Sequence, residues 1–222
     1  MTLHLISVIG SSPGVGKSTL CGAVAKWLAE SGASVDHFEE ADILTRAAFQ
    51  PVAEEFGDGT GAVRPETLVA CTRAYVTESV SAGRDYVVTD ALLPFIPSLV
   101  AWGHGEVALT RVMDELTRAV EPAQVTLVYV HDDPEAALRR AVEREGPAWA
   151  DWYVRKLAAS PGTRSVHDLP SAATHLRHEA DLTRRLLART PWRVLTVDVG
   201  RLDARGAYLH TRGQLEELPG PA

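Results

Sequence analysis

The sequence predicts a three-layer α/β fold, in which a five-stranded parallel sheet carries helices on both faces. Short apolar runs alternate along the chain with longer segments whose apolar residues recur at helical spacing. The apolar runs are nearly continuous, which is typical of strands that are buried on both faces of a parallel sheet. A chain of 222 residues without repeats or a low-complexity linker fits one such domain, residues 1–222.

The expected elements follow one another in α/β order. Strands are expected at residues 3–9, 34–38, 86–89, 125–130 and 192–199. Helices are expected at residues 18–31, 43–56, 65–82, 106–120, 134–145, 149–159 and 171–189. Pro51 should break the second helix, because proline lacks the backbone N–H that a helix interior needs. From Gly200 the chain is polar and contains Gly and Pro, so we expect a flexible tail over residues 200–222.

Charge and composition argue against several classes of protein. With 22 Lys and Arg against 29 Asp and Glu, the net charge is −7, which disfavours broad affinity for nucleic acid or an anionic membrane. The most apolar stretch, residues 86–102, is interrupted by Asp90, Pro94 and Pro97 and is too short for a bilayer span. The two cysteines have no pairing or metal-type spacing, and we see no secretory signal, so we expect a cytoplasmic protein.

A glycine-rich turn stands between the first expected strand and the first expected helix. Glycines let consecutive backbone N–H groups curl around an anion, and the start of the helix presents unpaired N–H groups to the same anion. Lys17 can then reach the β- and γ-phosphates of ATP, and the Ser18 hydroxyl can ligate Mg²⁺. The residues expected to bind the nucleotide are Ser12, Pro13, Gly14, Val15, Gly16, Lys17, Ser18 and Thr19. The strict Walker A pattern has its first glycine at position 11, where this chain has Ser11 preceded by Gly10.

Other segments narrow the class of nucleotide-binding protein. The chain has no Asn/Thr-Lys-x-Asp segment for reading guanine, and Ser12 stands where partition-type ATPases carry their signature lysine. The segment from Val125 to Gly146 resembles the strand, Asp/Pro turn and arginine-bearing helix that precede the lid of the thymidylate kinase and deoxynucleoside kinase families. This resemblance implies a P-loop NTPase fold with a helical lid at about residues 139–170. It also implies that Arg140 and Arg144 close over the triphosphate.

Acidic residues follow two of the expected strands. Asp90 ends the third strand in the Walker B position, from which a carboxylate can hold the Mg²⁺ shell while Ser18 binds the metal. In the families named above an arginine follows this acidic residue, whereas here Ala91 follows. Glu40 and Asp42 come after the second strand, where deoxynucleoside kinases place their hydroxyl-activating glutamate. By that likeness, Glu40 is expected to act as general base or to position the acceptor, with Asp42 as the second choice.

The segment from Leu92 to Trp102 leaves the sheet directly after the third strand and is rich in large apolar residues. We interpret it as one wall of an acceptor pocket, to which Phe95 and the nearby His104 contribute. A subunit contact and simple hydrophobic core are the alternative interpretations of this segment.

Three functions are compatible with these features. The first is ATP- and Mg²⁺-dependent transfer of the γ-phosphoryl group to a hydroxyl of a small molecule, either nucleoside- or nucleotide-like or a natural product or antibiotic. Its expected catalytic residues are Lys17, Glu40, Asp90, Arg140 and Arg144. The second is an ATP-dependent ligase resembling dethiobiotin synthetase, which the arginine-bearing helix disfavours. The third is a nucleotide-dependent binding or regulatory module. We expect a homodimer, since this is the commonest oligomer.

Overall fold

The computed structural model describes residues 2–58 and 61–217, which contain a five-stranded parallel sheet in the order β2-β3-β1-β4-β5. The strands are β1 (Leu3–Gly10), β2 (Val35–Phe38), β3 (Tyr86–Thr89), β4 (Ala123–His131) and β5 (Arg193–Asp198). The predicted α/β fold with a five-stranded parallel sheet is therefore confirmed.

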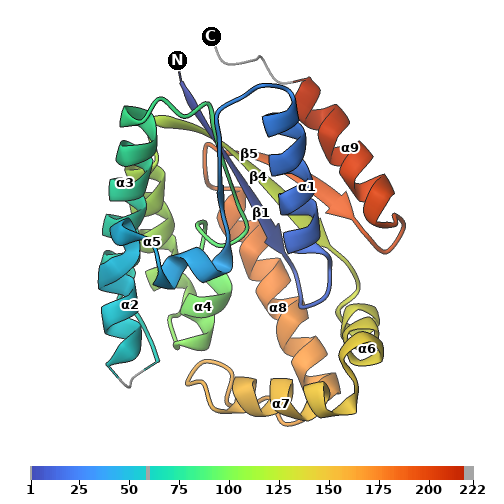
Figure 1. Cartoon of the computed structure of the whole chain (residues 1–222). Helices are drawn as coiled ribbons and strands as arrows, with labels where there is room; N and C mark the ends of the chain where they lie inside the picture. Colours follow the sequence, from blue (N-terminus) through green and yellow to red (C-terminus); the bar gives the residue numbers. More distant parts are fainter. Residues whose placement is uncertain (1, 59–60, 218–222) are drawn as a thin grey trace.

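Helices cover both faces of this sheet (Figure 1). One face carries α1 (Lys17–Glu30) and α9 (Ala204–Glu216), and the other carries α3 (Pro65–Ser81), α5 (Glu106–Ala119) and α8 (Leu169–Leu187). The side chains of β1 divide between these layers, because successive residues of a strand point to opposite faces. Leu5 packs in the apolar cluster on the α3 side, and Ile6 packs in the cluster on the α1 side. This two-sided burial explains why the strand carries apolar residues on both of its faces.

The remaining elements surround the carboxyl ends of the strands. They are η1 (Glu40–Leu44), η2 (Ala47–Phe49), α2 (Gln50–Gly57), α4 (Ile96–Ala101), α6 (Pro134–Glu145) and α7 (Pro147–Ala158). A third apolar cluster joins α6 and α7 to the start of α8, through Leu138, Tyr153 and Leu176 among others. These three helices account for most of the expected lid region.

The segment after β2 differs from its expected structure. The helix expected at residues 43–56 is divided into η1, η2 and α2, and Pro51 lies in the first turn of α2 instead of breaking a helix. In the first turn the missing N–H of proline is harmless, because that group has no partner within the helix in any case. The apolar segment after β3 also contains α4, a helix that the sequence did not indicate.

The prediction of a flexible tail from residue 200 is wrong for residues 204–216, which form α9. The Asp203 side chain caps this helix by accepting a hydrogen bond of 2.7 Å from the Gly206 N–H. Ala207 and Leu215 of α9 are buried in the same cluster as the apolar face of α1. This helix was not predicted because its composition is mostly polar, and its few apolar residues face the core. Residues 218–222 of the predicted tail lie outside the described residues.

The sheet brings the ends of three strands to one edge. Ser7 of β1 and Phe38 of β2 both pair with Thr89 of β3, so the loops that follow these strands start side by side. In open parallel sheets, ligands bind at this carboxyl edge. The glycine-rich turn, the acidic segment after β2 and Asp90 are therefore neighbours in space.

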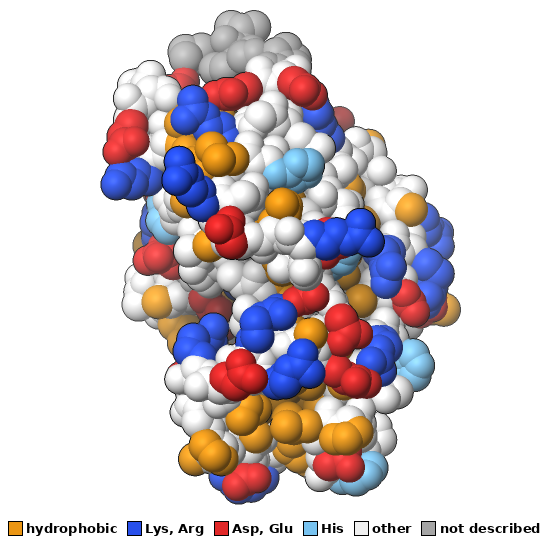
Figure 2. Space-filling view, turned by 90° about the vertical axis from the view of Figure 1, so that its right-hand side faces the viewer, with side chains coloured by type: hydrophobic (Ala, Val, Ile, Leu, Met, Phe, Trp, Pro, Cys, Tyr) orange, Lys and Arg blue, Asp and Glu red, His pale blue; other side chains and the backbone are white. Residues whose placement is uncertain are grey.

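Figure 2 shows the face of the molecule on the right-hand side of Figure 1. Lys and Arg side chains are interspersed with Asp and Glu on this face, and hydrophobic side chains gather at its lower end. The face shown does not carry the continuous basic surface that nucleic-acid binding requires. Within the described residues, none of the helices has the length and hydrophobicity needed to span a membrane.

Candidate nucleotide and acceptor site

The glycine-rich turn adopts the conformation that close approach of an anion requires. Gly14 and Gly16 have φ of 81° and 87°, a region that residues with a Cβ rarely adopt. A Cβ on Gly14 would lie 3.4 Å from the Cβ of Ala141, because α6 packs directly on the turn. Gly16 caps α1 without any side-chain hydrogen bond, and the first turn of α1 contains no acidic residue. The amides at the start of α1 are thus left for an anion.

Ser11, which replaces the first glycine of the strict pattern, is accommodated by the loop after β4. Its side chain is buried, and its hydroxyl accepts a hydrogen bond of 3.3 Å from the Asp132 N–H. The glycine one place earlier has a steric reason of its own, since a Cβ on Gly10 would lie 2.7 Å from Cγ2 of Val15. Ser11 in place of glycine therefore adds a hydrogen bond to the loop after β4 and does not change the conformation of the turn.

Asp90, directly after β3, contacts the glycine-rich turn and the start of α1. Its Oδ2 lies 3.0 Å from Lys17 Nζ and accepts a hydrogen bond of 2.5 Å from the Ser18 hydroxyl. Lys17 Nζ also donates to the Asp90 carbonyl oxygen at 2.8 Å. The other carboxylate oxygen, Oδ1, is buried and has no hydrogen-bond partner among the described residues, and the same holds for the Ser12 hydroxyl. Unpartnered buried oxygens of this kind are uncommon and point to a missing ligand.

The Ser18–Asp90 pair fits Mg²⁺, which prefers hydroxyl and carboxylate oxygens and takes its other ligands from substrate phosphates and water. In residues 2–58 and 61–217 no group of three or more His, Cys, Asp or Glu side chains could hold a metal ion by itself. Ser18 and Asp90 are the two residues that were predicted to hold the metal, and their role as ligands stays a prediction.

A first cavity of about 350 Å³, here called the outer cavity, opens between α1, α6 and the β5–α9 loop. Gly14 and Gly16 line it from the glycine-rich turn, Thr19 lines it from α1, and Tyr208 lines it from α9. Arg140 also lines the outer cavity and forms an ion pair with Asp132. Among the two expected lid arginines, only Arg140 lines this cavity. Arg144 is exposed and pairs with its neighbour Glu145 at 2.7 Å.

A second cavity of about 260 Å³, here called the inner cavity, is lined by Lys17 and by Gly10 at the end of β1. It is bounded by the ends of β1 and β3, by η1, by the β3–α4 loop with α4, and by α8. Its polar lining comes from Lys17, Glu40, Asp90, Ser98 and Thr183. Its apolar lining includes Ile9, Ile43, Leu93, Pro94, Phe95 and Ile96. The cavity combines a mostly apolar wall with two carboxylates.

Phe95 forms the apolar wall in a strained backbone conformation. Its φ is 61°, in the left-handed region, which costs a residue with a side chain about 1–2 kcal/mol. The preceding loop is held in place because the buried Ser7 hydroxyl donates a hydrogen bond of 2.8 Å to the Leu93 carbonyl oxygen. Strained residues of this kind concentrate at ligand sites.

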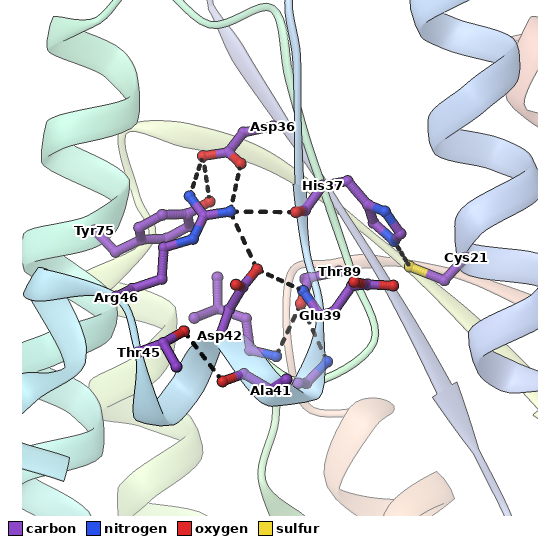
Figure 3. Close-up of polar contacts among 12 residues, drawn as sticks. Cys21, Asp36, His37, Glu39, Ala41, Asp42, Thr45, Arg46, Tyr75 and Thr89 are labelled. Atoms are coloured by element: carbon purple, nitrogen blue, oxygen red, sulfur yellow. Dashed lines mark hydrogen bonds and ion pairs between the residues drawn. The ribbon is translucent and has the colours of Figure 1, made fainter. Parts of the chain in front are cut away.

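A network of polar contacts holds the segment that carries Glu40 (Figure 3). Arg46 donates two hydrogen bonds of 2.9 Å to the carboxylate of Asp36, one of 3.2 Å to the His37 carbonyl oxygen and one of 3.1 Å to the carboxylate of Asp42. The hydroxyl of Tyr75 donates to the same Asp36 carboxylate at 2.8 Å. Burial raises the pKa of Asp36, but the hydrogen bonds from Arg46 and Tyr75 outweigh it and hold that pKa below its usual value. The network ties β2 to η1 and α3.

The expected acceptor residues fall into two groups. Glu40 and Phe95 line the inner cavity. The Asp42 side chain is instead held by Arg46 and the Glu39 N–H, and His104 lies after α4; neither residue lines the inner cavity. Thr183 of α8 also lines the cavity and was missed, because a single threonine in an amphipathic helix gives no sequence signal.

Comparison with protein-family models gives no match, and comparison with curated protein sequences gives none either. Among solved structures, the chain is similar to thymidylate kinase from Ehrlichia chaffeensis, with a TM-score of 0.58 and 14% sequence identity. The similarity covers 97% of this chain and 99% of that chain. At this identity the similarity shows the fold alone. The chain thus shares its fold with that protein, and its activity must be argued from the site.

Proposed function

We propose that the protein is an ATP- and Mg²⁺-dependent kinase that phosphorylates a hydroxyl group of a small molecule. The observation that carries this proposal is that both cavities adjoin the same turn, since Gly16 and Thr19 line the outer cavity and Lys17 lines the inner cavity. The outer cavity adjoins the phosphate-binding turn, and the inner cavity adjoins Lys17, Asp90 and Glu40. A nucleotide in the outer cavity and an acceptor in the inner cavity would meet at this turn. In-line transfer requires this arrangement, because the attacking and leaving oxygens lie on opposite sides of the phosphorus.

The residues of the turn have separate tasks in this proposal. The amides of residues 14–19 hold the phosphates, and Lys17 leaves Asp90 to contact the β- and γ-phosphates. Mg²⁺, held through Ser18 and Asp90, would neutralise charge on the transferring group. Arg140 already lines the outer cavity and would turn from Asp132 to the phosphates, and Arg144 would follow on lid closure.

Glu40 is proposed to orient the acceptor hydroxyl and to accept its proton. The acceptor oxygen forms a bond to the γ-phosphorus while the bond from that phosphorus to the β–γ bridging oxygen breaks, and ADP leaves with the electron pair. Glu40 is exposed on η1 and lines the inner cavity, so it can pass the proton on to water.

The test is Glu40→Gln, assayed with γ-labelled ATP, Mg²⁺ and a panel of nucleosides, nucleoside monophosphates and amino sugars. We expect kcat for label transfer to fall by roughly 10²–10⁴-fold, the usual contribution of a general base, with ATP affinity kept. Glu54→Gln, which changes an exposed carboxylate on α2, is the matched control and should behave as the unchanged protein.

Two outcomes would refute the proposal. Binding of ATP without label transfer to any hydroxyl compound would favour a nucleotide-dependent binding module. An acid-labile acyl phosphate in place of a stable phosphate ester would favour a ligase that activates a carboxylate or carbamate.

A further inference from the structure

Asp132 directly follows β4 and carries a buried carboxylate. Its side chain is 5% exposed, whereas the side chain of its ion-pair partner Arg140 is 44% exposed. Asp132 Oδ1 accepts a hydrogen bond of 2.7 Å from the Asp133 N–H, and Asp132 Oδ2 accepts one from the guanidinium of Arg140. A buried carboxylate is costly unless it is paired and hydrogen-bonded, and these two contacts meet that need.

Three segments that line the outer cavity meet at Asp132. The Asp132 N–H donates to the hydroxyl of Ser11 in the glycine-rich turn, at 3.3 Å. Arg140 belongs to α6, and Gly200 belongs to the loop between β5 and α9. A Cβ on Gly200 would lie 2.7 Å from Asp132 Oδ1, so this loop packs directly against the carboxylate. Asp132 therefore lies where the turn, α6 and the β5–α9 loop join.

In the proposed kinase, two anions compete for Arg140. Its side chain lines the outer cavity, where the triphosphate would lie, and it forms the ion pair with Asp132. Because this side chain is long and exposed, rotation about its own bonds can carry the guanidinium from one anion to the other. While Arg140 is bound to Asp132, it is withheld from the triphosphate.

A third cavity, of about 290 Å³ and here called the rear cavity, makes it possible for Asp132 to lose this partner. The rear cavity is bounded by β4, β5, α6 and α8. Asp132 lines it together with Arg177, Arg184 and Asp181 of α8. The cavity is polar and large enough for water, and its two guanidinium groups favour the charged form of a nearby carboxylate. Asp132 is therefore not left in apolar surroundings when Arg140 departs.

We propose that Asp132 is a positioning residue that acts through Arg140: it holds the guanidinium away from the triphosphate and thereby lowers the affinity for ATP. This inference rests on the nucleotide binding that the proposed function requires. A group that must first leave another partner lowers the apparent affinity for a ligand, in proportion to the fraction of the group that is free. After transfer, ADP carries one phosphate group fewer, so Asp132 would draw Arg140 back and aid the release of ADP.

The test is Asp132→Asn in the full-length protein, with binding of the non-hydrolysable ATP analogue AMP-PNP and Mg²⁺ measured by titration calorimetry. Asparagine keeps the shape of the side chain, and its oxygen can still accept from the Asp133 N–H, but it has no charge to hold Arg140. We expect Kd to fall about fivefold, which corresponds to the upper end of measured exposed ion pairs. Glu135→Gln is the matched control, because it removes one carboxylate of α6 that pairs with Arg177 instead, and it should leave Kd nearly unchanged.

A double-mutant cycle shows whether Asp132 acts through Arg140. Arg140→Gln should weaken binding of AMP-PNP, and in this background Asp132→Asn should no longer strengthen it. A merely structural role of Asp132 would change Kd equally in both backgrounds. If Asp132→Asn does not fold, the Nε–H signal of Arg140 in the NMR spectrum of the unchanged protein, assigned by its loss in Arg140→Lys, provides a second measurement. This signal should shift when AMP-PNP binds, because Arg140 changes partner.

Unchanged or weaker binding of AMP-PNP by a folded Asp132→Asn variant would overturn this inference and leave the kinase function standing, since phosphoryl transfer is measured separately. An equal gain in the Arg140→Gln background, or an Nε–H signal of Arg140 that does not move, would overturn it as well. Tighter binding by Asp132→Asn without phosphoryl transfer to any acceptor would support this inference and refute the kinase function. Failure of the unchanged protein to bind AMP-PNP would overturn both.

Discussion

The two halves of the candidate site are built in different ways. The half that would hold the phosphates of the nucleotide comes from one contiguous stretch, residues 10–19, and presents backbone amides and a helix start. The half that would hold the acceptor is assembled from η1, the end of β3, the loop before α4 and one turn of α8. Chemistry made by the backbone needs only local conformation, whereas chemistry made by side chains needs the fold to bring distant segments together.

This difference implies that the two halves can be damaged separately. A Cβ added to the turn should weaken nucleotide binding and spare the acceptor side. A change in the Arg46 network that holds η1 should weaken acceptor binding and spare nucleotide binding. Within the described residues, we expect only Lys17 and Asp90 to affect both halves. Both residues line the inner cavity, and Asp90 contacts Lys17 next to the turn.

The largest effect is expected for Lys17→Ala, because this side chain serves both halves. Phosphoryl transfer should fall by roughly 10³-fold, as when a preorganised charge-stabilising group is removed, and ATP binding should be lost with it. Titration calorimetry with ATP and Mg²⁺ and a label-transfer assay measure the two losses. Lys26→Ala, on the exposed side of α1, is the control. Unchanged ATP binding in Lys17→Ala would contradict the assignment of the turn.

The next effect is expected for Gly14→Ala, which tests the nucleotide half alone. At φ of 81° an alanine costs about 1–2 kcal/mol, and its Cβ would touch Ala141 of α6 at 3.4 Å. ATP affinity should fall about tenfold, with KM for the acceptor unchanged. Gly57→Ala, at a site where a Cβ meets nothing within 4 Å, should leave ATP affinity unaltered. An equal fall in both variants would contradict a role for the turn geometry.

A smaller effect is expected for Arg46→Met, which tests the acceptor half. The guanidinium that joins Asp36 to Asp42 is removed, so η1 should be positioned less firmly and the free energy of unfolding should fall by about 1–2 kcal/mol. We expect a lower kcat/KM for the acceptor and unchanged ATP affinity, by steady-state kinetics and calorimetry. Loss of ATP affinity would mean that the two halves are coupled through β2.

The smallest effect is expected in the pH dependence of stability. Because the pKa of Asp36 is lowered in the folded state, its contribution to stability is present above its unfolded pKa of about 3.9 and is lost as the pH falls through the folded value. Urea unfolding from pH 6 downward should therefore show a loss of stability below about pH 4. That loss should be smaller in Arg46→Met, since the variant has already lost the interaction. An unchanged slope would show that Asp36 is not stabilised by Arg46.

Helices with local end signals were predicted most accurately. The helix expected at residues 134–145 has these bounds in α6, where Asp133 accepts a hydrogen bond of 2.9 Å from the Ala136 N–H and Pro134 opens the first turn. By contrast, α9 was missed because its apolar residues are few and its stability comes from packing on α1. The segment between β2 and α3 was predicted as a single helix broken at Pro51. This prediction was wrong because the shape of the segment depends on the pairing of Arg46 with Asp36.

The residues of the candidate site divide in the same way, into those set by local sequence and those set by packing. By itself, the sequence determined the glycine-rich turn, the strand that precedes it and the helix that follows, because glycine freedom and helix start signals act over a few neighbouring residues. It also placed Asp90 and Glu40 at strand ends. Only the tertiary structure decided that Glu40 lines a cavity while Asp42 is held by Arg46. Only the tertiary structure brought Thr183 of α8 to that cavity, because helix packing, not sequence spacing, selects which turn faces the sheet.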